Sequence, residues 1–168
     1  MRRRTLLHVG VATGTLLALA GAGLALTRAG LRNGRLTDAG REVFHAVARA
    51  VLDGSLPIDP AMQAKALQGQ LTRLDITIGG FPPALQGELA ELTALLAHAA
   101  GRLILTGLHT DWPLASLSQV QTMMQGLRES KLAVRQQIYH ALRDLTQAAY
   151  FADPATWPAM GYAGPLAV

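Results

Sequence analysis

Apolar residues recur at intervals of three and four along most of this 168-residue chain. This spacing places them on one side of an α-helix. The pattern is plainest near the C-terminal end, in Leu132, Ile138, Leu142, Leu145 and Ala149. No ladder of strands is visible in the pattern, and each helical stripe must be buried against another helix. We therefore predict an all-α fold, an irregular bundle of about five helices.

Capping residues and prolines predict where these helices begin. They stand at Thr37, Asp59-Pro60, Pro82-Pro83 and Ser116 or Ser118, and the fifth helix follows a short break from Arg128 to Lys131. Ser116 and Gln119 have the spacing of a capping box. Met62 is expected on the apolar stripe of the second helix, and the β-branched run before Gly79-Gly80 predicts a loop or extended segment over 75–80. The third helix is expected to run through Leu103.

The segment 1–26 is unlike the rest of the chain. Arg2, Arg3 and Arg4 are followed by a run from Leu6 to Leu26 that carries no formal charge apart from His8. A basic head before an apolar run is the layout of a secretory signal. As a helix the run would be about 30 Å long, enough to cross a bilayer. We expect a leader helix that is either removed near Ala20-Gly21-Ala22 or kept as an anchor in the inner membrane.

The start of this leader resembles a twin-arginine export signal, in which two arginines precede any residue and two hydrophobic ones. Its expected residues are Arg3, Arg4, Leu6 and Leu7, and His8 stands where a lysine is usual. Such signals direct proteins that are exported already folded. The expected location is therefore the periplasm, and the twin-arginine translocase is an expected partner.

Charge and cysteine content narrow the possibilities for the remainder. The leader holds three of the fifteen basic residues and none of the eleven acidic ones, so the rest has a net charge near +1. A near-neutral domain gives no electrostatic argument for binding nucleic acid. With no cysteine, disulfides and thiolate metal sites are excluded. We expect a linker over 27–36, one helical domain over 37–152 and an extended C-terminal arm over 153–168.

Motifs that would carry chemistry are missing from the sequence. His45, His98, His109 and His140 are far apart and form no metal-ligand spacing. Core or boundary positions are the simpler interpretation of His45 and His98. No nucleophile elbow or dinucleotide-binding glycine pattern occurs after a strand. We expect no catalytic, cofactor-binding or metal residue in this chain.

Aromatic residues gather near the C-terminus, where Tyr150, Phe151, Trp157 and Tyr162 lie among small residues, prolines and glycines. The segment is too poor in polar residues for a disordered tail and too broken for a long helix. Two interpretations stay open. The arm packs back on its own bundle, or some of its aromatics anchor on a partner, as large rigid side chains do at interfaces.

The segment 142–166 resembles the C-terminal signature of the small subunits of membrane-associated flavin dehydrogenases, the group that includes the gluconate 2-dehydrogenase subunit 3 family. That signature has an aromatic pair, a turn with proline, a further aromatic and a Gly-Tyr-Pro-Gly-Pro end, and here Ala163 replaces the inner proline. The matching positions, which become the candidate partner-binding residues, are Tyr150, Phe151, Asp153, Pro154, Trp157, Gly161, Tyr162, Gly164 and Pro165.

The resemblance implies an accessory role. Such small subunits have no cofactor and bind a large FAD-dependent catalytic subunit of the glucose–methanol–choline type, which has no leader and is exported folded with them. A cytochrome c subunit often completes the complex. The alternative from the residues alone is a standalone periplasmic helical binding or structural protein, held at the membrane by its leader. An enzyme in its own right is the interpretation that the sequence favours least.

Overall fold

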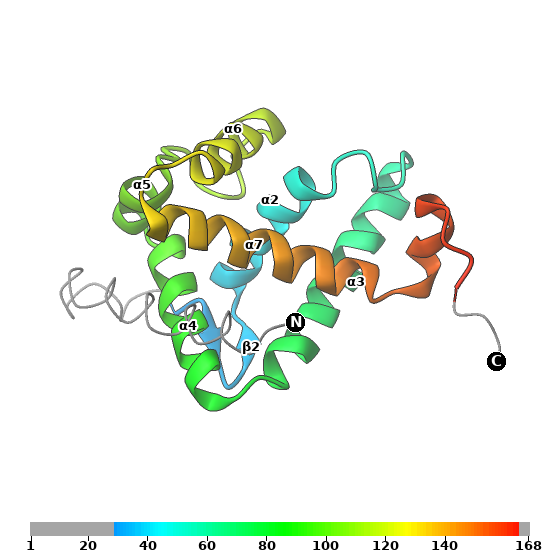
Figure 1. Cartoon of the computed structure of the whole chain (residues 1–168), viewed down its shortest axis with the longest axis horizontal. Helices are drawn as coiled ribbons and strands as arrows, with labels where there is room; N and C mark the ends of the chain where they lie inside the picture. The colour runs from blue at the N-terminus through cyan, green and yellow to red at the C-terminus, as the bar shows by residue number, and fades with distance from the viewer. Residues whose placement is uncertain (1–28, 165–168) are drawn as a thin grey trace.

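The computed structural model describes residues 29–164, which form an all-α, irregular bundle (Figure 1). The leader residues Arg3, Arg4, Leu6 and Leu7 lie outside these residues, as does Pro165. The described elements are, in chain order, β1 (Leu31–Arg32), β2 (Arg35–Leu36), α2 (Asp38–Val51), α3 (Pro60–Gly79), α4 (Pro83–Ala97), α5 (Ala99–Thr106), α6 (Leu117–Arg128), α7 (Ala133–Phe151) and the 3-10 helix η1 (Pro154–Met160).

Helix α2 is at the centre of the bundle and packs against α3, α4, α6 and α7. Val43, Phe44 and Val47 on its apolar face are fully buried, as their spacing predicts. Thr37 caps the helix by accepting a hydrogen bond from the Gly40 amide. At Gly40 a Cβ atom would lie 2.1 Å from the carbonyl oxygen of Gly30, so only glycine lets the two backbones approach this closely.

The prediction of a plain linker over 27–36 is wrong for its described part, because β1 and β2 form a short antiparallel hairpin there. Leu31 pairs with Leu36, and both side chains are buried in the core. Asn33 and Gly34 have positive φ angles, as a tight turn between two strands requires. The Asp75 carboxylate accepts a hydrogen bond from the Leu36 amide at 2.8 Å. Burial of the two leucines thus folds a segment that resembles a linker.

Two predictions about α3 are also wrong. The helix does not end before residue 75 but continues to Gly79, because Ile78 is fully buried and the Thr77 hydroxyl bonds to the Arg73 carbonyl at 3.0 Å. Packing therefore overrides the low helix propensity of β-branched residues. Met62, expected on the apolar stripe, is exposed. The cap at Asp59 is confirmed, since its side chain accepts from the Met62 amide at 2.8 Å.

The single third helix expected through Leu103 is two helices, α4 and α5, which meet at His98 with a bend of 98°. His98 has extended backbone angles, and its Nδ1 accepts the Ala100 amide at 3.3 Å as the N-cap of α5. At Gly101 a Cβ atom would lie 2.2 Å from the Leu95 carbonyl oxygen, so the bend is tight. No single helix within residues 29–164 is long and apolar enough to cross a membrane.

Helix α6 begins as predicted, and Ile138, Leu142 and Ala149 of α7 are buried as their spacing predicts. Leu132, expected on the same apolar stripe, instead precedes the helix and is 61% exposed. Ser116 and Gln119 form both hydrogen bonds of the capping box at the start of α6. Helix α7 crosses the bundle and packs on α2, α3 and α6, as its apolar stripe requires (Figure 1). The prediction of an extended arm from residue 153 is wrong for its first part, which is the 3-10 helix η1. Proline at the first position and an Asp153 cap favour that short helix.

Candidate partner-binding site

The candidate residues divide into a buried root and an exposed end. Tyr150 belongs to the root: it is 3% exposed and packs with Ala48, Leu52 and Leu67. Its hydroxyl donates to the Ser55 carbonyl at 2.8 Å. Burial, above all, raises the pKa of the Tyr150 phenol, the nearby Asp153 carboxylate raises it further, and the Arg73 charge opposes them. Tyr150 is therefore a core residue that holds the end of α7.

Asp153 and Arg73 fix the turn that follows α7. Arg73 Nη1 lies 3.0 Å from Asp153 Oδ2, while Arg73 Nε donates to the Ala149 carbonyl at 2.7 Å. The other oxygen of Asp153 accepts the Ala155 amide at 3.0 Å and caps η1, which begins at Pro154. One guanidinium of α3 therefore binds both the last turn of α7 and the residue that starts the arm.

Trp157 holds the arm together from within. Its indole Nε1 donates to the Phe151 carbonyl at 2.9 Å, and its ring lies 5.3 Å from the Tyr162 ring, centroid to centroid. Gly161 ends η1 with φ of 74°, a conformation that suits glycine, and turns the chain so that Tyr162 meets Trp157. Gly164 passes beside the same indole. Together these residues form a small folded unit at the surface, which we call the arm knot. Its members are Phe151, Trp157, Gly161, Tyr162 and Gly164.

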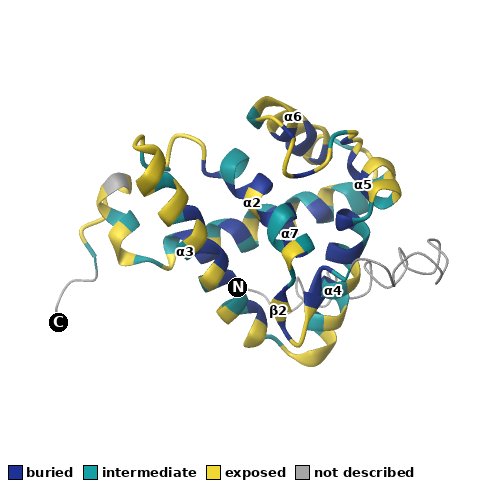
Figure 2. Cartoon of the chain, turned by 180° about the vertical axis from the view of Figure 1, so that it is seen from behind, coloured by how far each residue is buried: buried dark blue, intermediate teal, exposed yellow. Residues whose placement is uncertain are grey.

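The arm knot lies at one end of the molecule (Figure 1), and Figure 2 shows it as mostly exposed or intermediate. Met160 is 48% exposed and Tyr162 is 49% exposed. Phe151, half-buried, stands edge-on to Tyr150 with ring centroids 5.1 Å apart. The structure thus brings Trp157, Gly161, Tyr162 and Gly164 together on the surface, and it separates them from Tyr150, which is inside.

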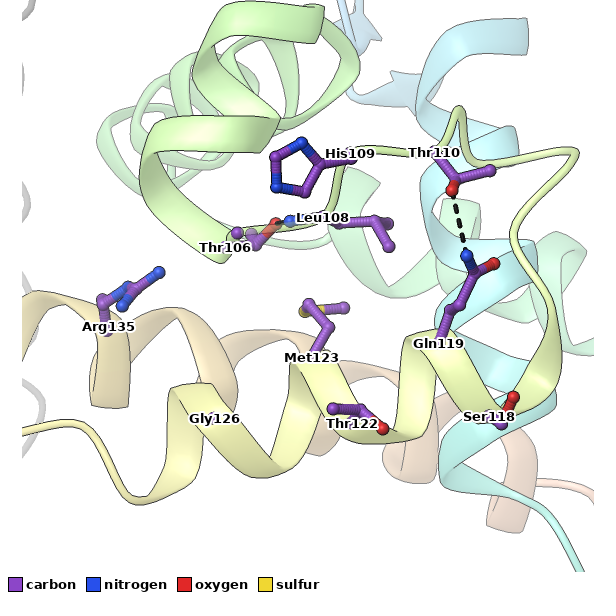
Figure 3. Close-up of a pocket in the computed structure, with 11 residues that line it drawn as sticks. Thr106, Leu108, His109, Thr110, Ser118, Gln119, Thr122, Met123, Gly126 and Arg135 are labelled. Carbon is purple, nitrogen blue, oxygen red and sulfur yellow. Dashed lines mark hydrogen bonds between the residues drawn. The ribbon is translucent and has the colours of Figure 1, made fainter.

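A second candidate is an open groove of about 500 Å³ beneath α5, between the loop after that helix and α6 (Figure 3). His109, Gln119 and Met123 are among the side chains that line it. Arg135 stands at one end, where its Nε is already bound to the Leu105 carbonyl at 2.7 Å. Thr110 and Gln119 bond to each other at 3.1 Å across the opposite end. Most polar groups of this groove therefore have partners within the protein.

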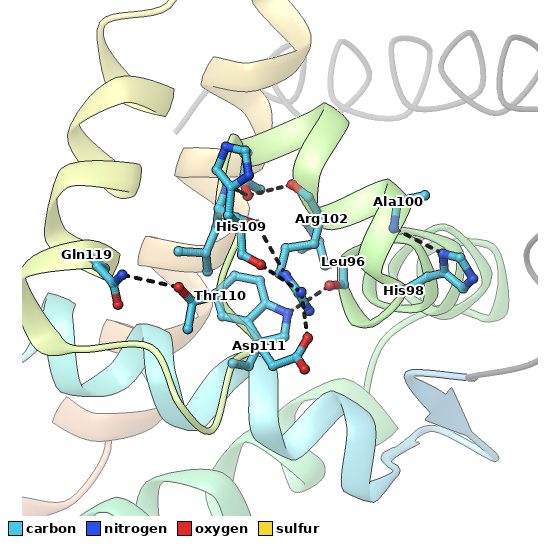
Figure 4. Close-up of polar contacts among 11 residues, drawn as sticks. Leu96, His98, Ala100, Arg102, His109, Thr110, Asp111 and Gln119 are labelled. Atoms are coloured by element: carbon cyan, nitrogen blue, oxygen red, sulfur yellow. Dashed lines mark hydrogen bonds and ion pairs between the residues drawn. The ribbon is translucent and has the colours of Figure 1, made fainter.

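Beside this groove lies Arg102, a buried arginine that no motif in the sequence marks (Figure 4). Its guanidinium donates to the carbonyl oxygens of Leu108 and His109 and lies 2.5 Å from Asp111 Oδ1. The Trp112 indole donates to the Leu96 carbonyl at 2.7 Å in the same region. These bonds hold the loop between α5 and α6. One feature of the sequence could have indicated that Arg102 is buried: it is the single charged residue of the otherwise largely apolar segment 99–106.

Comparisons of the chain with protein-family models, with curated proteins and with solved structures found no match.

The histidines take structural or surface positions. His98 is the cap between α4 and α5 rather than a residue within a helix, and His109 lines the groove. His45 lies in the middle of α2 with its side chain exposed at the surface. Burial of part of the ring and the nearby Arg49 charge lower its pKa and favour the neutral imidazole. Within residues 29–164, no three His, Asp or Glu side chains are grouped to hold a metal ion.

Proposed function

We propose that this chain is a non-catalytic accessory subunit. It binds and stabilises an FAD-dependent catalytic subunit of a flavin dehydrogenase and escorts it, folded, through twin-arginine export to the periplasm. FAD belongs to the partner in this proposal, and a cytochrome c subunit is a further expected member of the complex. The leader supplies the export signal through Arg3, Arg4, Leu6 and Leu7.

The observation that carries the proposal is the arm knot. Its aromatic residues match the resemblance noted over 142–166, and Met160 and Tyr162 keep about half of their surfaces exposed. Internal hydrogen bonds and the Arg73–Asp153 ion pair support this surface before any partner arrives. Aromatic side chains that are rigid in the free protein lose little entropy on binding, which favours their use as interface anchors.

Tandem-affinity purification from the native cell, followed by a flavin absorption spectrum, tests this proposal. We expect a large flavoprotein to copurify with the wild-type chain. The variant with Arg3→Lys and Arg4→Lys should leave that flavoprotein in the cytoplasm, whereas Arg32→Lys and Arg35→Lys, on the exposed part of the hairpin, serve as the matched control. Export of the flavoprotein at the wild-type level with the altered leader would contradict the escort role.

One observation favours the second candidate, a standalone periplasmic protein. The root of the arm packs on its own bundle through Tyr150 and Asp153, so the fold does not require a partner there. This candidate predicts a monomer that purifies alone, without flavin. The copurification experiment separates the two, because only the accessory subunit has a flavoprotein attached.

A further inference from the structure

Exposed aliphatic side chains gather at the end of the bundle formed by α5 and the start of α7. Leu103 and Ile104 are 42% and 76% exposed on α5, and Leu132, just before α7, is 61% exposed. The hydrogen bond from Arg135 to the Leu105 carbonyl joins these two segments. We call the surface formed by Leu103, Ile104, Arg128, Lys131, Leu132 and Arg135 the α5 tip.

The α5 tip is positively charged. Arg128, Lys131 and Arg135 lie in the segment 128–135, whose acidic member is Glu129, while α5 itself contains no acidic residue. Arg128 has an ion pair with Glu129 at 3.8 Å between exposed groups. The remaining acidic group close in the chain, Asp111, is held by the buried Arg102. Three basic residues and one acidic residue in the segment 128–135 therefore leave a net charge of +2 beside the aliphatic residues.

The tip also lies near the place where the leader joins the domain. The described chain starts at Ala29, and the next residue, Gly30, packs directly on Thr93 of α4. Thr93 lies about one turn before the end of α4 at Ala97, and α5 follows directly after the bend at His98. A leader inserted in a bilayer would therefore hold this end of the bundle, rather than the distant arm knot, toward the lipid.

The composition favours lipid over protein as the occupant. Lysine is depleted at protein interfaces, and leucine is under-represented among their anchoring residues. Exposed Leu and Ile beside Lys and Arg are instead typical of surfaces that rest in the headgroup layer of anionic membranes. We propose that the α5 tip docks on an anionic lipid surface, with Ile104 and Leu132 inserted at the headgroup boundary and the exposed Arg128 and Lys131 facing lipid phosphates.

Fluorescence of single-cysteine variants tests this inference, and the cysteine-free chain makes the labelling specific. Ile104→Cys and Leu132→Cys report on the tip. Ile76→Cys on α3, 72% exposed in the wild type, is the matched control for Ile104 at 76%. Each full-length variant carries an environment-sensitive dye and is reconstituted in vesicles of phosphatidylcholine, with or without phosphatidylglycerol, and with spin-labelled lipid as quencher.

With phosphatidylglycerol present, we expect blue-shifted and quenched emission at positions 104 and 132 and water-like emission at position 76. Replacing Arg128 or Lys131 by Gln should reduce the ratio of docked to undocked tip about fivefold, and high salt should act in the same direction. Sedimentation with the vesicles confirms that the chain is bound to lipid in every sample.

Three results would overturn the inference. The first is water-like emission at position 104 in chains that sediment with anionic vesicles. The second is equal quenching at positions 104 and 76, or quenching at 104 that is as strong without phosphatidylglycerol. The third is a blue shift at position 104 that grows with protein concentration but is not quenched by spin-labelled lipid. That result would assign the tip to contact with a second copy of the chain. None of these results bears on whether a flavoprotein copurifies.

Discussion

Arg73 Nη1 lies 3.0 Å from Asp153 Oδ2, so a residue of α3 holds the second residue after α7, eighty positions later in the chain. The same guanidinium binds the Ala149 carbonyl. This fork-like use of one arginine fixes the direction in which the arm leaves the bundle, a geometry that a lysine could not reproduce. Most of the arm knot, including the half-exposed Tyr162 ring, follows Asp153 in the chain.

Replacing Arg73 by Lys should loosen the arm and leave the bundle folded. Both side chains are partly exposed, so we expect a loss of about 0.5–1 kcal/mol in the free energy of unfolding. Amide hydrogen exchange at residues 155–162 should become faster, while exchange in α2 stays slow. The exposed pair Arg143–Asp144 provides the control through Arg143→Lys. Unchanged exchange in the arm of the Arg73 variant would show that the ion pair does not hold it.

Trp157→Ala and Tyr162→Ala test the arm knot as a binding surface. If the aromatic pair anchors the flavoprotein, each substitution should weaken the complex by about 2 kcal/mol or more. Tyr162→Ala should leave the melting temperature of the isolated chain nearly unchanged, since that ring is half exposed. Binding is measured by titration with the purified partner and stability by thermal unfolding. A variant that lowers the melting temperature but binds normally would favour packing within the chain as the role of the aromatics.

Tyr150→Phe should lower the free energy of unfolding by about 1 kcal/mol, because it removes the hydrogen bond to the Ser55 carbonyl without creating a cavity. It should also change the dependence of stability on alkaline pH. The folded protein raises the Tyr150 pKa above its ordinary value of 10.0, so the unfolded chain releases this proton first. Wild-type stability should therefore fall as pH rises above 10, and this component of the fall should be missing in Tyr150→Phe. Urea unfolding across that range measures both effects, with Tyr162→Phe as the control.

Arg102→Met should destabilise the loop between α5 and α6. The substitution leaves the carbonyl oxygens of Leu108 and His109 without their donor. We therefore expect the free energy of unfolding to fall by about 2 kcal/mol. Asp111→Asn should cost less, since that carboxylate is 62% exposed and water can replace the arginine. Urea unfolding compares the two variants. Equal losses would mean that the ion pair, rather than the bonds to the backbone, holds the loop.

Thr146→Val should stabilise the protein by about 1 kcal/mol. The Thr146 hydroxyl on α7 is fully buried, and among the described residues it has no hydrogen-bond partner. Valine has the same shape and avoids the cost of burying an unpaired hydroxyl. Thr93→Val is the matched control, because the buried Thr93 hydroxyl bonds to the Leu89 carbonyl at 2.7 Å. A destabilised Thr146→Val variant would indicate that an internal water or a shifted partner satisfies this group.

The helices that could be predicted from the sequence are those whose local signals agree. Ser116 with Gln119 marks the start of α6, and Ile138, Leu142 and Ala149 of the predicted stripe lie on the buried face of α7. Where local and long-range effects compete, the predictions failed. Ile76 to Ile78 favours an extended segment by propensity, yet burial of Ile78 keeps it helical. His98 shows no local signal for a break, because the bend depends on contacts around Gly101.

The candidate site divides in the same way. The cluster of aromatics near the C-terminus is visible in the sequence, but their separate roles are not. Spacing cannot show that Tyr150 lies inside against Ser55 while Tyr162 faces out beside Trp157. Arg102 has the appearance of a surface charge in the sequence, and it is buried only because three backbone and side-chain oxygens of a folded loop surround it.

By itself, the sequence determined that residues 29–164 form a helical bundle, because helical periodicity, capping and the need to bury apolar stripes are local properties. The tertiary structure alone decided that the segment before α2 is a hairpin, that α4 and α5 bend apart and that Arg73 holds the arm to α3. Each of these depends on burial or on a partner distant in the chain. The free energy of such contacts comes from residues that the local pattern does not contain, and this is the physical reason that the sequence could not specify them.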